Sequence, residues 1–237
     1  MSAAMPSSEP ADAAPEHSSD RHVDVWEVAL EPCDADAAAR LLSDSERGFA
    51  ARLRVGADAW VAARIALRRI LGRSLGLAPA QVALEAGANG KPRLAPGPRP
   101  DLRFNLSHSG DFALVAIRQD HEVGIDVERT RADVDGVAIS RDTFGVDEHE
   151  AALGVTGSSE QFFRSWVRRE ALAKASGRGI LSPPLPGDAA RYTVRDLEGI
   201  PGFAAAVASE GDDWSVRWAG RLVSCMEGPA PRPRGAP

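Results

Sequence analysis

The chain has 237 residues and a formal net charge of −6, from 28 Lys and Arg against 34 Asp and Glu. This acidic balance argues against nucleic acid as the main partner, because a phosphate backbone is bound by basic surfaces. No apolar run approaches the roughly 20 residues that cross a bilayer, and no secretory signal pattern is present, so we expect a cytoplasmic protein without a membrane span. Two cysteines are too few for a disulfide scaffold or a zinc site.

The first half of the chain predicts a mixture of strands and helices behind a polar leader. Residues 1–20 are rich in Ala, Ser and Pro and show no periodicity, which is typical of a disordered leader. β-Branched and aromatic residues indicate strands, and capping signals with a 3.6-residue apolar stripe indicate helices. In chain order, the expected elements are a strand over 23–30, helices over 44–54 and 57–77, a short strand over 82–87 and a dense strand region over 102–130.

The second half repeats this mixture, so the chain is assigned to the α+β class. Segments 112–117 and 123–128 are separated by a short polar stretch, which predicts a hairpin. Ser158 and Gln161 form a capping box ahead of a clear amphipathic helix. The elements expected after the hairpin are a helix around 140–153, the amphipathic helix over 160–176, strands over 191–197, 203–209 and 214–220, and a disordered, proline-rich tail over 228–237.

The segment GIDVE, residues 124–128, places two carboxylates side by side. In a strand, Asp126 and Glu128 point to one face, whereas Ile125 and Val127 point to the other. Two neighbouring carboxylates repel each other unless a cation lies between them, and a hard divalent cation takes oxygen ligands. The alternative is that both face water, and an exposed carboxylate contributes little to stability, so Asp126→Ala is expected to leave the fold intact.

The amphipathic helix carries an acid and a base on an apolar stripe. Phe163, Val167, Glu170 and Lys174 fall on one side of the helix. Because a charged pair on a core-facing stripe is costly without partners, Glu170 is a candidate third oxygen ligand and Lys174 a candidate partner of an anionic substrate. The alternative is a surface ion pair worth only about 0.3–0.5 kcal/mol.

Two further segments hold polar residues near turns. Asn105, Ser107 and His108 crowd the end of a strand, and an imidazole can donate to phosphate oxygens. Lys91 follows an Asn-Gly turn and precedes Pro92, where it can contact a phosphate as a point charge. The Walker A pattern and a hydrolase triad are both absent. The alternatives are a structural histidine in a turn and an exposed turn lysine.

Rare residue types gather in these segments. Both lysines of the chain, Lys91 and Lys174, and one of its two asparagines lie inside them. In order and content the segments resemble one family, the 4′-phosphopantetheinyl transferases of the surfactin-synthetase-activating type. The motifs that carry the resemblance are GKP at 90–92, FNLSHSGD at 104–111, GIDVE at 124–128, FxxWxxxEAxxK at 163–174 and GxG at 177–179.

The resemblance implies a fold and an activity. Such enzymes are single-chain pseudo-dimers of two similar α+β subdomains with coenzyme A in the cleft between them, here expected over 21–118 and 119–227. They transfer the 4′-phosphopantetheine arm of coenzyme A to a serine hydroxyl of an acyl- or peptidyl-carrier protein and release 3′,5′-ADP. The resemblance also implies dependence on Mg²⁺, with Mn²⁺ as a substitute, and a monomer. The carrier protein, and hence the biosynthetic pathway, stays open.

The same resemblance implies roles for individual residues. Asp126, Glu128 and Glu170 would hold the metal ion. Lys174 and His108 would neutralise the pyrophosphate, and Glu170 would accept the proton of the carrier serine. The residues implied on the coenzyme A side are Lys91, Pro92, Asn105, Ser107, His108, Lys174 and Arg54.

Some family positions differ in this chain, and two other functions stay open. Ala86 stands where the family commonly has a basic residue, which leaves a contact to the 3′-phosphate unassigned; Arg54, Arg64 and Arg68 are the candidates to replace it. The alternative functions are a non-catalytic coenzyme A-binding protein and a hydrolase that splits the pyrophosphate of coenzyme A with water.

Overall fold

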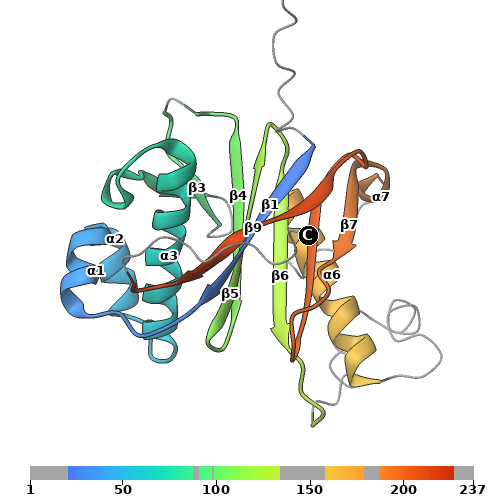
Figure 1. Ribbon diagram of the computed structural model, residues 1–237, viewed down its shortest axis with the longest axis horizontal. Coiled ribbons are helices and arrows are strands. Elements are labelled where there is room, and N and C mark those ends of the chain that lie inside the picture. Colours follow the sequence, from blue (N-terminus) through green and yellow to red (C-terminus); the bar gives the residue numbers. More distant parts are fainter. Residues whose placement is uncertain (1–20, 88–90, 98, 134–157, 179–186, 227–237) are drawn as a thin grey trace, which may run out of the picture.

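The computed structural model describes residues 21–87, 91–97, 99–133, 158–178 and 187–226 (Figure 1). Several expectations fall outside these residues: the disordered leader, the helix around 140–153 and the disordered tail. So do two motif residues, Gly90 of GKP and Gly179 of GxG. Within the described part, the expected strands and helices are confirmed, with ends that differ by a few residues.

The first sheet combines strands from both ends of the chain. It holds β1 (His22–Ala29), β4 (Leu102–Ser109), β5 (Phe112–Gln119) and β9 (Ser215–Val223), in the order β4-β5-β1-β9. β1 pairs antiparallel with β5 and parallel with β9. The sequence range 119–227, predicted as the second subdomain, therefore includes a strand, β9, that belongs to the sheet of the first half.

One long helix covers the outer face of this sheet. α3 (Ala57–Leu75) packs its apolar stripe against β1, β4 and β5. Two short helices, α1 (Ala35–Leu41) and α2 (Asp44–Ala50), precede it, and α2 begins with the predicted capping box. The 3₁₀ turn η1 (Pro79–Gln81) and the small hairpin of β2 (Leu84–Ala86) and β3 (Pro92–Leu94) follow it.

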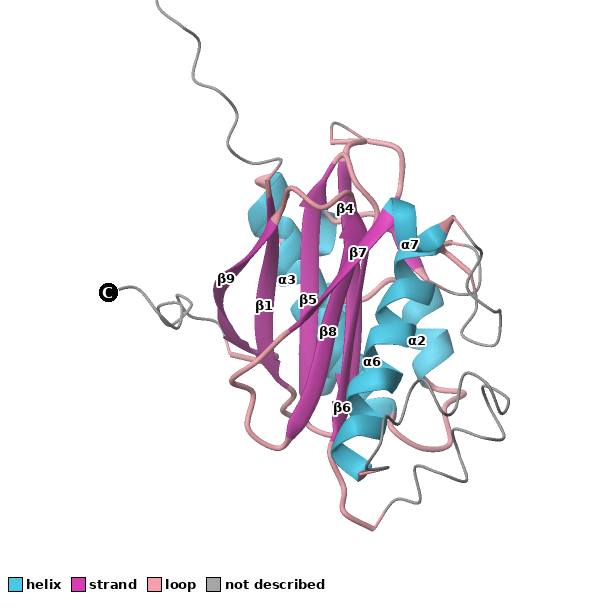
Figure 2. Ribbon diagram, turned by 90° about the vertical axis from the view of Figure 1, so that its right-hand side faces the viewer, coloured by secondary structure: helices cyan, strands magenta, loops and turns pink. Residues whose placement is uncertain are grey.

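The second half repeats the arrangement of one helix on one sheet. The antiparallel strands β6 (Val123–Arg129), β8 (Phe203–Glu210) and β7 (Tyr192–Asp196) form its sheet. α6 (Ser159–Ser176) covers β6 and β8 and begins with the predicted capping box, and α7 (Asp188–Arg191) is a single turn before β7 (Figure 2). The two halves confirm the predicted α+β pseudo-dimer.

The two sheets pack face to face between α3 and α6, as Figure 1 shows. Val25 of β1 and Leu114 of β5 lie in the same core as Ile125 of β6 and Val207 of β8. The predicted hairpin of β5 and β6 is wrong, because these strands belong to different sheets. Both are buried on both faces; a hairpin with one face in water would alternate apolar and polar residues.

A disulfide joins the chain segments that follow two neighbouring strands. Cys33 lies beyond β1 and Cys225 beyond β9, with their Cα atoms 5.3 Å apart. The pairing follows from the parallel alignment of β1 and β9, which brings the ends of both strands together. The cysteine count alone did not predict this single bond. None of the helices in the described residues is both long and apolar enough to span a membrane.

Candidate active site

β4 and β6 are edge strands of two different sheets. They contact each other through their side chains. Ser107 Oγ donates to Asp126 Oδ1 (2.7 Å), and Ser109 Oγ donates to Glu128 Oε2 (2.8 Å). Side chains alternate along a strand, so both serines point to the same side of β4 and both carboxylates to the same side of β6. The serines in the FNLSHS segment therefore orient the two carboxylates of GIDVE.

Helix α6 contributes an amine to this contact. Lys174 Nζ donates to Asp126 Oδ1 (2.6 Å) and to Ser107 Oγ (3.0 Å). It also donates to the backbone oxygen of Ile125 (3.3 Å) and lies 3.9 Å from Glu170 Oε2. One amine thus contacts carboxylates from β6 and from α6. The alternative of an isolated surface pair between Glu170 and Lys174 is wrong, since the lysine is bound to a strand carboxylate inside the protein.

Asp126 is buried, with 3% of its surface exposed. The reading in which both strand carboxylates face water is therefore wrong for Asp126, and so is the expectation that it contributes little to stability. Glu128, nearer the end of the strand, is half-buried. The second oxygen of Asp126, Oδ2, is buried without a hydrogen-bond partner. A buried carboxylate oxygen without a partner is costly unless a ligand satisfies it.

A cavity of about 370 Å³ opens on these side chains. It collects most of the expected site residues from β3, β4, β6 and α6, and α3 supplies its far wall. The predicted residues in its lining are Pro92, Ser107, His108, Asp126, Glu128, Glu170 and Lys174. Trp60 and Arg64 of α3 line it as well. The cavity is therefore built by both halves of the chain.

The carboxylates in this cavity destabilise one another. Burial, with the negative charges of Asp126 and Glu128, raises the pKa of Glu170 to about 7 against the opposing effect of Lys174. Burial also raises the pKa of Glu128, with Asp126 adding to the effect. The pKa of His108 is lowered by burial and by the charge of Lys174. The cavity therefore has acidic groups that a cation would stabilise and a histidine that is neutral at pH 7.

The same carboxylates are not arranged as a preformed metal site. In the described part of the chain, no group of three or more His, Cys, Asp or Glu side chains is arranged so that it could hold a metal ion. Lys174 and Ser107 donate to Asp126 Oδ1, and Ser109 donates to one oxygen of Glu128. The residues nevertheless fit a divalent cation in their chemistry, since Asp126 Oδ2 has no partner and the three carboxylates repel.

Two family models match this chain. A model of the 4′-phosphopantetheinyl transferase N-terminal region matches residues 26–120, and a model of the 4′-phosphopantetheinyl transferase superfamily matches residues 122–213. The chain belongs to the 4′-phosphopantetheinyl transferase family. It is an enzyme of this class, and its two matched regions cover the two halves of the fold.

Individual relatives of this transferase include bacterial and animal enzymes. The 4′-phosphopantetheinyl transferase HetI of Nostoc sp. is 34% identical over 67% of this chain and 73% of its own length. The 4′-phosphopantetheinyl transferase psf-1 of Bacillus pumilus is 31% identical over 66% of this chain and 70% of its own length. The human L-aminoadipate-semialdehyde dehydrogenase-phosphopantetheinyl transferase is 31% identical over 52% of this chain, which spans 44% of that protein.

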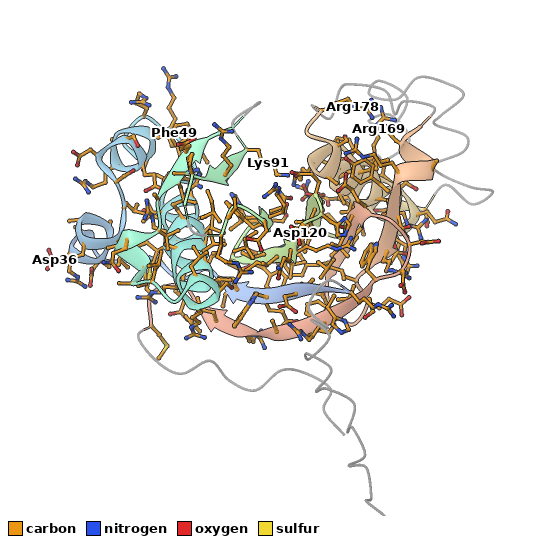
Figure 3. The ribbon with its side chains drawn as sticks, turned by 90° about the horizontal axis from the view of Figure 1, so that it is seen from above. Asp36, Phe49, Lys91, Asp120, Arg169 and Arg178 are labelled. Carbon is orange, nitrogen blue, oxygen red and sulfur yellow. A yellow bond between two sulfur atoms is a disulfide. The ribbon has the colours of Figure 1, made fainter. Side chains whose placement is uncertain are left out.

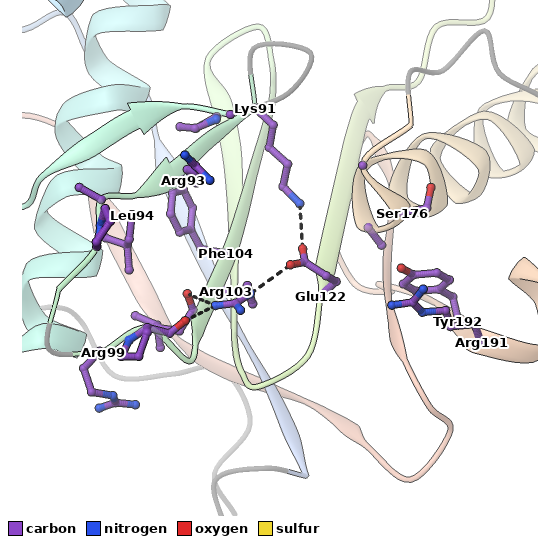
Figure 4. A pocket seen from close by; sticks show the side chains of 18 residues that line it. Lys91, Arg93, Leu94, Arg99, Arg103, Phe104, Glu122, Ser176, Arg191 and Tyr192 are labelled. Atoms are coloured by element: carbon purple, nitrogen blue, oxygen red, sulfur yellow. Dashed lines mark hydrogen bonds and ion pairs between the residues drawn. The ribbon is translucent and has the colours of Figure 1, made fainter.

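Two residues predicted on the coenzyme A side of the transferase have partners elsewhere. Asn105 is buried, and its Oδ1 accepts the backbone N–H of Ile125 (2.8 Å), so its side chain ties β4 to β6. Lys91 lines a second cavity, of about 670 Å³, together with residues of β3, β4 and α6 (Figure 4). Neither side chain is in the lining of the carboxylate cavity.

The three arginines considered for the 3′-phosphate of coenzyme A differ in their positions relative to the carboxylate cavity. Arg54 is exposed between α2 and α3 and does not line the carboxylate cavity. Arg68 is buried and donates to Glu46 and to the backbone oxygen of Val82. Arg64 lines the cavity, with its guanidinium 4.8 Å from the ring of Trp60.

Sequence reasoning missed two residues of this transferase site. Ser109, which holds Glu128, lies two residues beyond Ser107, and the period of a strand could have found it. Trp60 belongs by spacing to the apolar stripe of α3, which predicts a core residue and no contact with a ligand. Its place in the cavity wall depends on how α3 sits against the first sheet, which the sequence does not give.

Proposed function

We propose that this transferase moves the 4′-phosphopantetheine arm of coenzyme A to a serine hydroxyl of a carrier protein and releases 3′,5′-ADP in a Mg²⁺-dependent reaction. The observation that supports it is the contact of Lys174 with Asp126 inside a cavity lined by both halves. Phosphoryl transfer depends on positioning and on neutralisation of charge. The cavity supplies carboxylates, an amine and an imidazole within one space.

Asp126, Glu128 and Glu170 are the residues that would hold the divalent cation. Mg²⁺, or Mn²⁺ in its place, would neutralise the negative charge of the pyrophosphate of coenzyme A. The partnerless oxygen of Asp126 and the raised pKa of Glu170 support this assignment. Each is costly in the protein alone and is relieved by a positive charge.

The basic side chains of the cavity are assigned to the substrate phosphates. Lys174 and His108 are placed to donate to the pyrophosphate oxygens, and Arg64 lies on the opposite wall, where it can pair with the nucleotide phosphate. Glu170, whose carboxylate lines the same cavity as Lys174 and His108, is the proposed acceptor of the serine proton.

The two halves of a single chain complete the site, which supports a monomer. β4 comes from the first half, and β6 and α6 come from the second. The five motifs also support the surfactin-synthetase-activating type, whose two subdomains lie in one chain. The carrier serine would reach the cavity from solvent on the surface of an acyl- or peptidyl-carrier protein.

Mass spectrometry of a carrier protein tests the proposal. The carrier is incubated with the transferase, coenzyme A and Mg²⁺, and a matched sample contains a chelator in place of the metal. We expect the carrier to gain the mass of the phosphopantetheine arm only with the metal, together with 3′,5′-ADP in equal amount. No adduct on fatty-acid, polyketide and peptide-synthetase carriers would contradict it. Free phosphopantetheine without a carrier would indicate the hydrolase, and binding of coenzyme A without turnover the binding protein.

A further inference from the structure

Both lysines of the chain lie on one free edge of β6. β6 is the outer strand of its sheet, so one side of its backbone lacks a strand partner. On that side Lys91 Nζ donates to the oxygen of Val123 (3.2 Å), and Lys174 Nζ donates to the oxygen of Ile125 (3.3 Å). Asn105 accepts the N–H of Ile125 between them. Side chains from β4, from α6 and from the segment before β3 therefore bond to the free edge of the strand that carries Asp126.

Lys91 also holds the end of α6. Its Nζ donates to the backbone oxygen of Lys174 (2.9 Å), in the last turn of the helix. The last four carbonyls of a helix lack partners within the helix, and a positive charge near them is favourable. One amine thus joins the first residue of β6 to the last turn of α6. These are the elements that carry Asp126 and Lys174.

The amine of Lys91 faces three oxygen atoms. An ammonium group has three protons. Two are directed to the oxygens of Val123 and Lys174, and the third faces the carboxylate of Glu122, 3.6 Å away (Figure 4). Seen from above, Lys91 points from the first half toward the second (Figure 3). Backbone oxygens thus hold two of the three protons, and the side chain lies outside the carboxylate cavity.

We infer that Lys91 is a positioning residue of the transferase, which fixes Lys174 against Asp126 by tying the last turn of α6 to β6. This inference rests on the proposed function, in which Lys174 and Asp126 act on the pyrophosphate. It assigns Lys91 a role in the geometry of the site in place of the phosphate contact that the sequence suggested. Loss of the tie is expected to loosen the end of α6 while the substrate-binding wall of α3 stays in place.

The test compares Lys91→Met with Arg93→Met. Arg93 is an exposed cation on the same hairpin, paired with Glu85, so its loss removes a charge nearby without touching the tie. For Lys91→Met we expect kcat to fall roughly ten- to hundredfold, as small misplacements do, with the Kd of coenzyme A unchanged. For Arg93→Met both stay at wild-type values. If Lys91→Met does not fold, Lys91→Arg, which alters the donor geometry but keeps the charge, is measured in its place.

A spectroscopic measurement separates positioning from stability and from turnover. In protein labelled with ¹³C- and ¹⁵N-lysine, the two lysines give two side-chain signals, assigned with Lys174→Met. We expect the Lys174 signal to shift in Lys91→Met and to stay unchanged in Arg93→Met. An unchanged Lys174 signal, or a Kd for coenzyme A weakened by about tenfold at unchanged kcat, would overturn the inference. If the wild-type protein transfers nothing, the proposed function fails, but the signal still tests the tie.

Discussion

Gly124 of β6 lies directly against the backbone of Ala171 in α6. A Cβ added at position 124 would come within 2.1 Å of the oxygen of Ala171 and 2.4 Å of the nitrogen of Ala175. Both are backbone atoms, so no side chain can move aside. The glycine of GIDVE therefore sets how closely α6 approaches the strand, and hence how far Lys174 must reach to contact Asp126.

Gly124→Ala is expected to push α6 away from β6. We predict a loss of stability of about 1–3 kcal/mol, as in other overpacked sites, and a fall in kcat because Lys174 moves away from Asp126. Denaturant unfolding and the transfer assay measure the two effects. Gly48→Ala is the control, since its Cβ meets only an ordinary contact at 3.7 Å within a helix. Wild-type stability and kcat in Gly124→Ala would contradict the proposed packing role.

Replacement of Asp126 is expected to affect both folding and transfer. Its Oδ1 accepts hydrogen bonds from Ser107 and Lys174 in a buried position. Asp126→Ala leaves the lysine without its carboxylate, and we predict a loss of about 3 kcal/mol, as for other broken buried pairs. Asp126→Asn keeps the shape and an acceptor for Ser107, so it should be less destabilised.

Asp126→Asn therefore isolates the charge of the carboxylate from its role in folding. We expect this variant to unfold in one cooperative transition and to transfer no phosphopantetheine at any Mg²⁺ concentration used for the wild type. The measurement is the rate of mass gain of the carrier at a temperature at which the variant is fully folded. A wild-type rate would show that the cation is held by other residues.

Much of the local structure could be predicted because it depends on nearby residues. The apolar stripe of α6 ends at Lys174, and its capping box begins one residue before the helix. The alternation in GIDVE placed Asp126 and Glu128 on one side of the strand, and both line the cavity. These features follow from the periods of a helix and a strand, which are read from a few consecutive residues.

The contacts between distant segments could not be predicted in the same way. Lys91 donates to backbone oxygens. Every residue has a backbone oxygen, so the amino-acid sequence cannot indicate which ones a lysine will contact. The hairpin prediction for β5 and β6 failed because two consecutive apolar strands can pair in one sheet or lie in two sheets that pack on each other. Their sequences do not distinguish these two arrangements. The rarity of lysine singled out Lys91 and Lys174 but does not say which atoms they contact.

Glu170 is expected to make the stability of the metal-free protein depend on pH. Its pKa is raised to about 7 in the fold, chiefly by burial, from a usual value of 4.5. Between these pH values the unfolded chain has lost this proton and the folded chain retains it, so stability falls as the pH rises. The effect of this one group is at most ~3 kcal/mol.

Glu170→Gln should remove this part of the pH dependence. Denaturant unfolding at pH 5 and pH 8, with a chelator present, is compared in the two proteins, and the wild type should lose more stability over this interval. Added Mg²⁺ should raise the Tm of the wild type more at pH 8 than at pH 6, since a deprotonated Glu170 is the better ligand. Equal pH dependence in the two proteins would show that Glu170 titrates normally.

Arg64 and Arg54 are expected to differ in their effect on coenzyme A. Arg64 lines the cavity opposite Lys174, whereas Arg54 is exposed outside it. If Arg64 pairs with the 3′-phosphate, Arg64→Met should raise the KM for coenzyme A by about tenfold, the size of a lost charged hydrogen bond. Arg54→Met should leave this KM unchanged. Dephospho-coenzyme A, which lacks the 3′-phosphate, isolates the contact: wild type and Arg64→Met should use it with the same KM. A selective loss in Arg54→Met would instead place the phosphate outside the cavity, near the segment between α2 and α3.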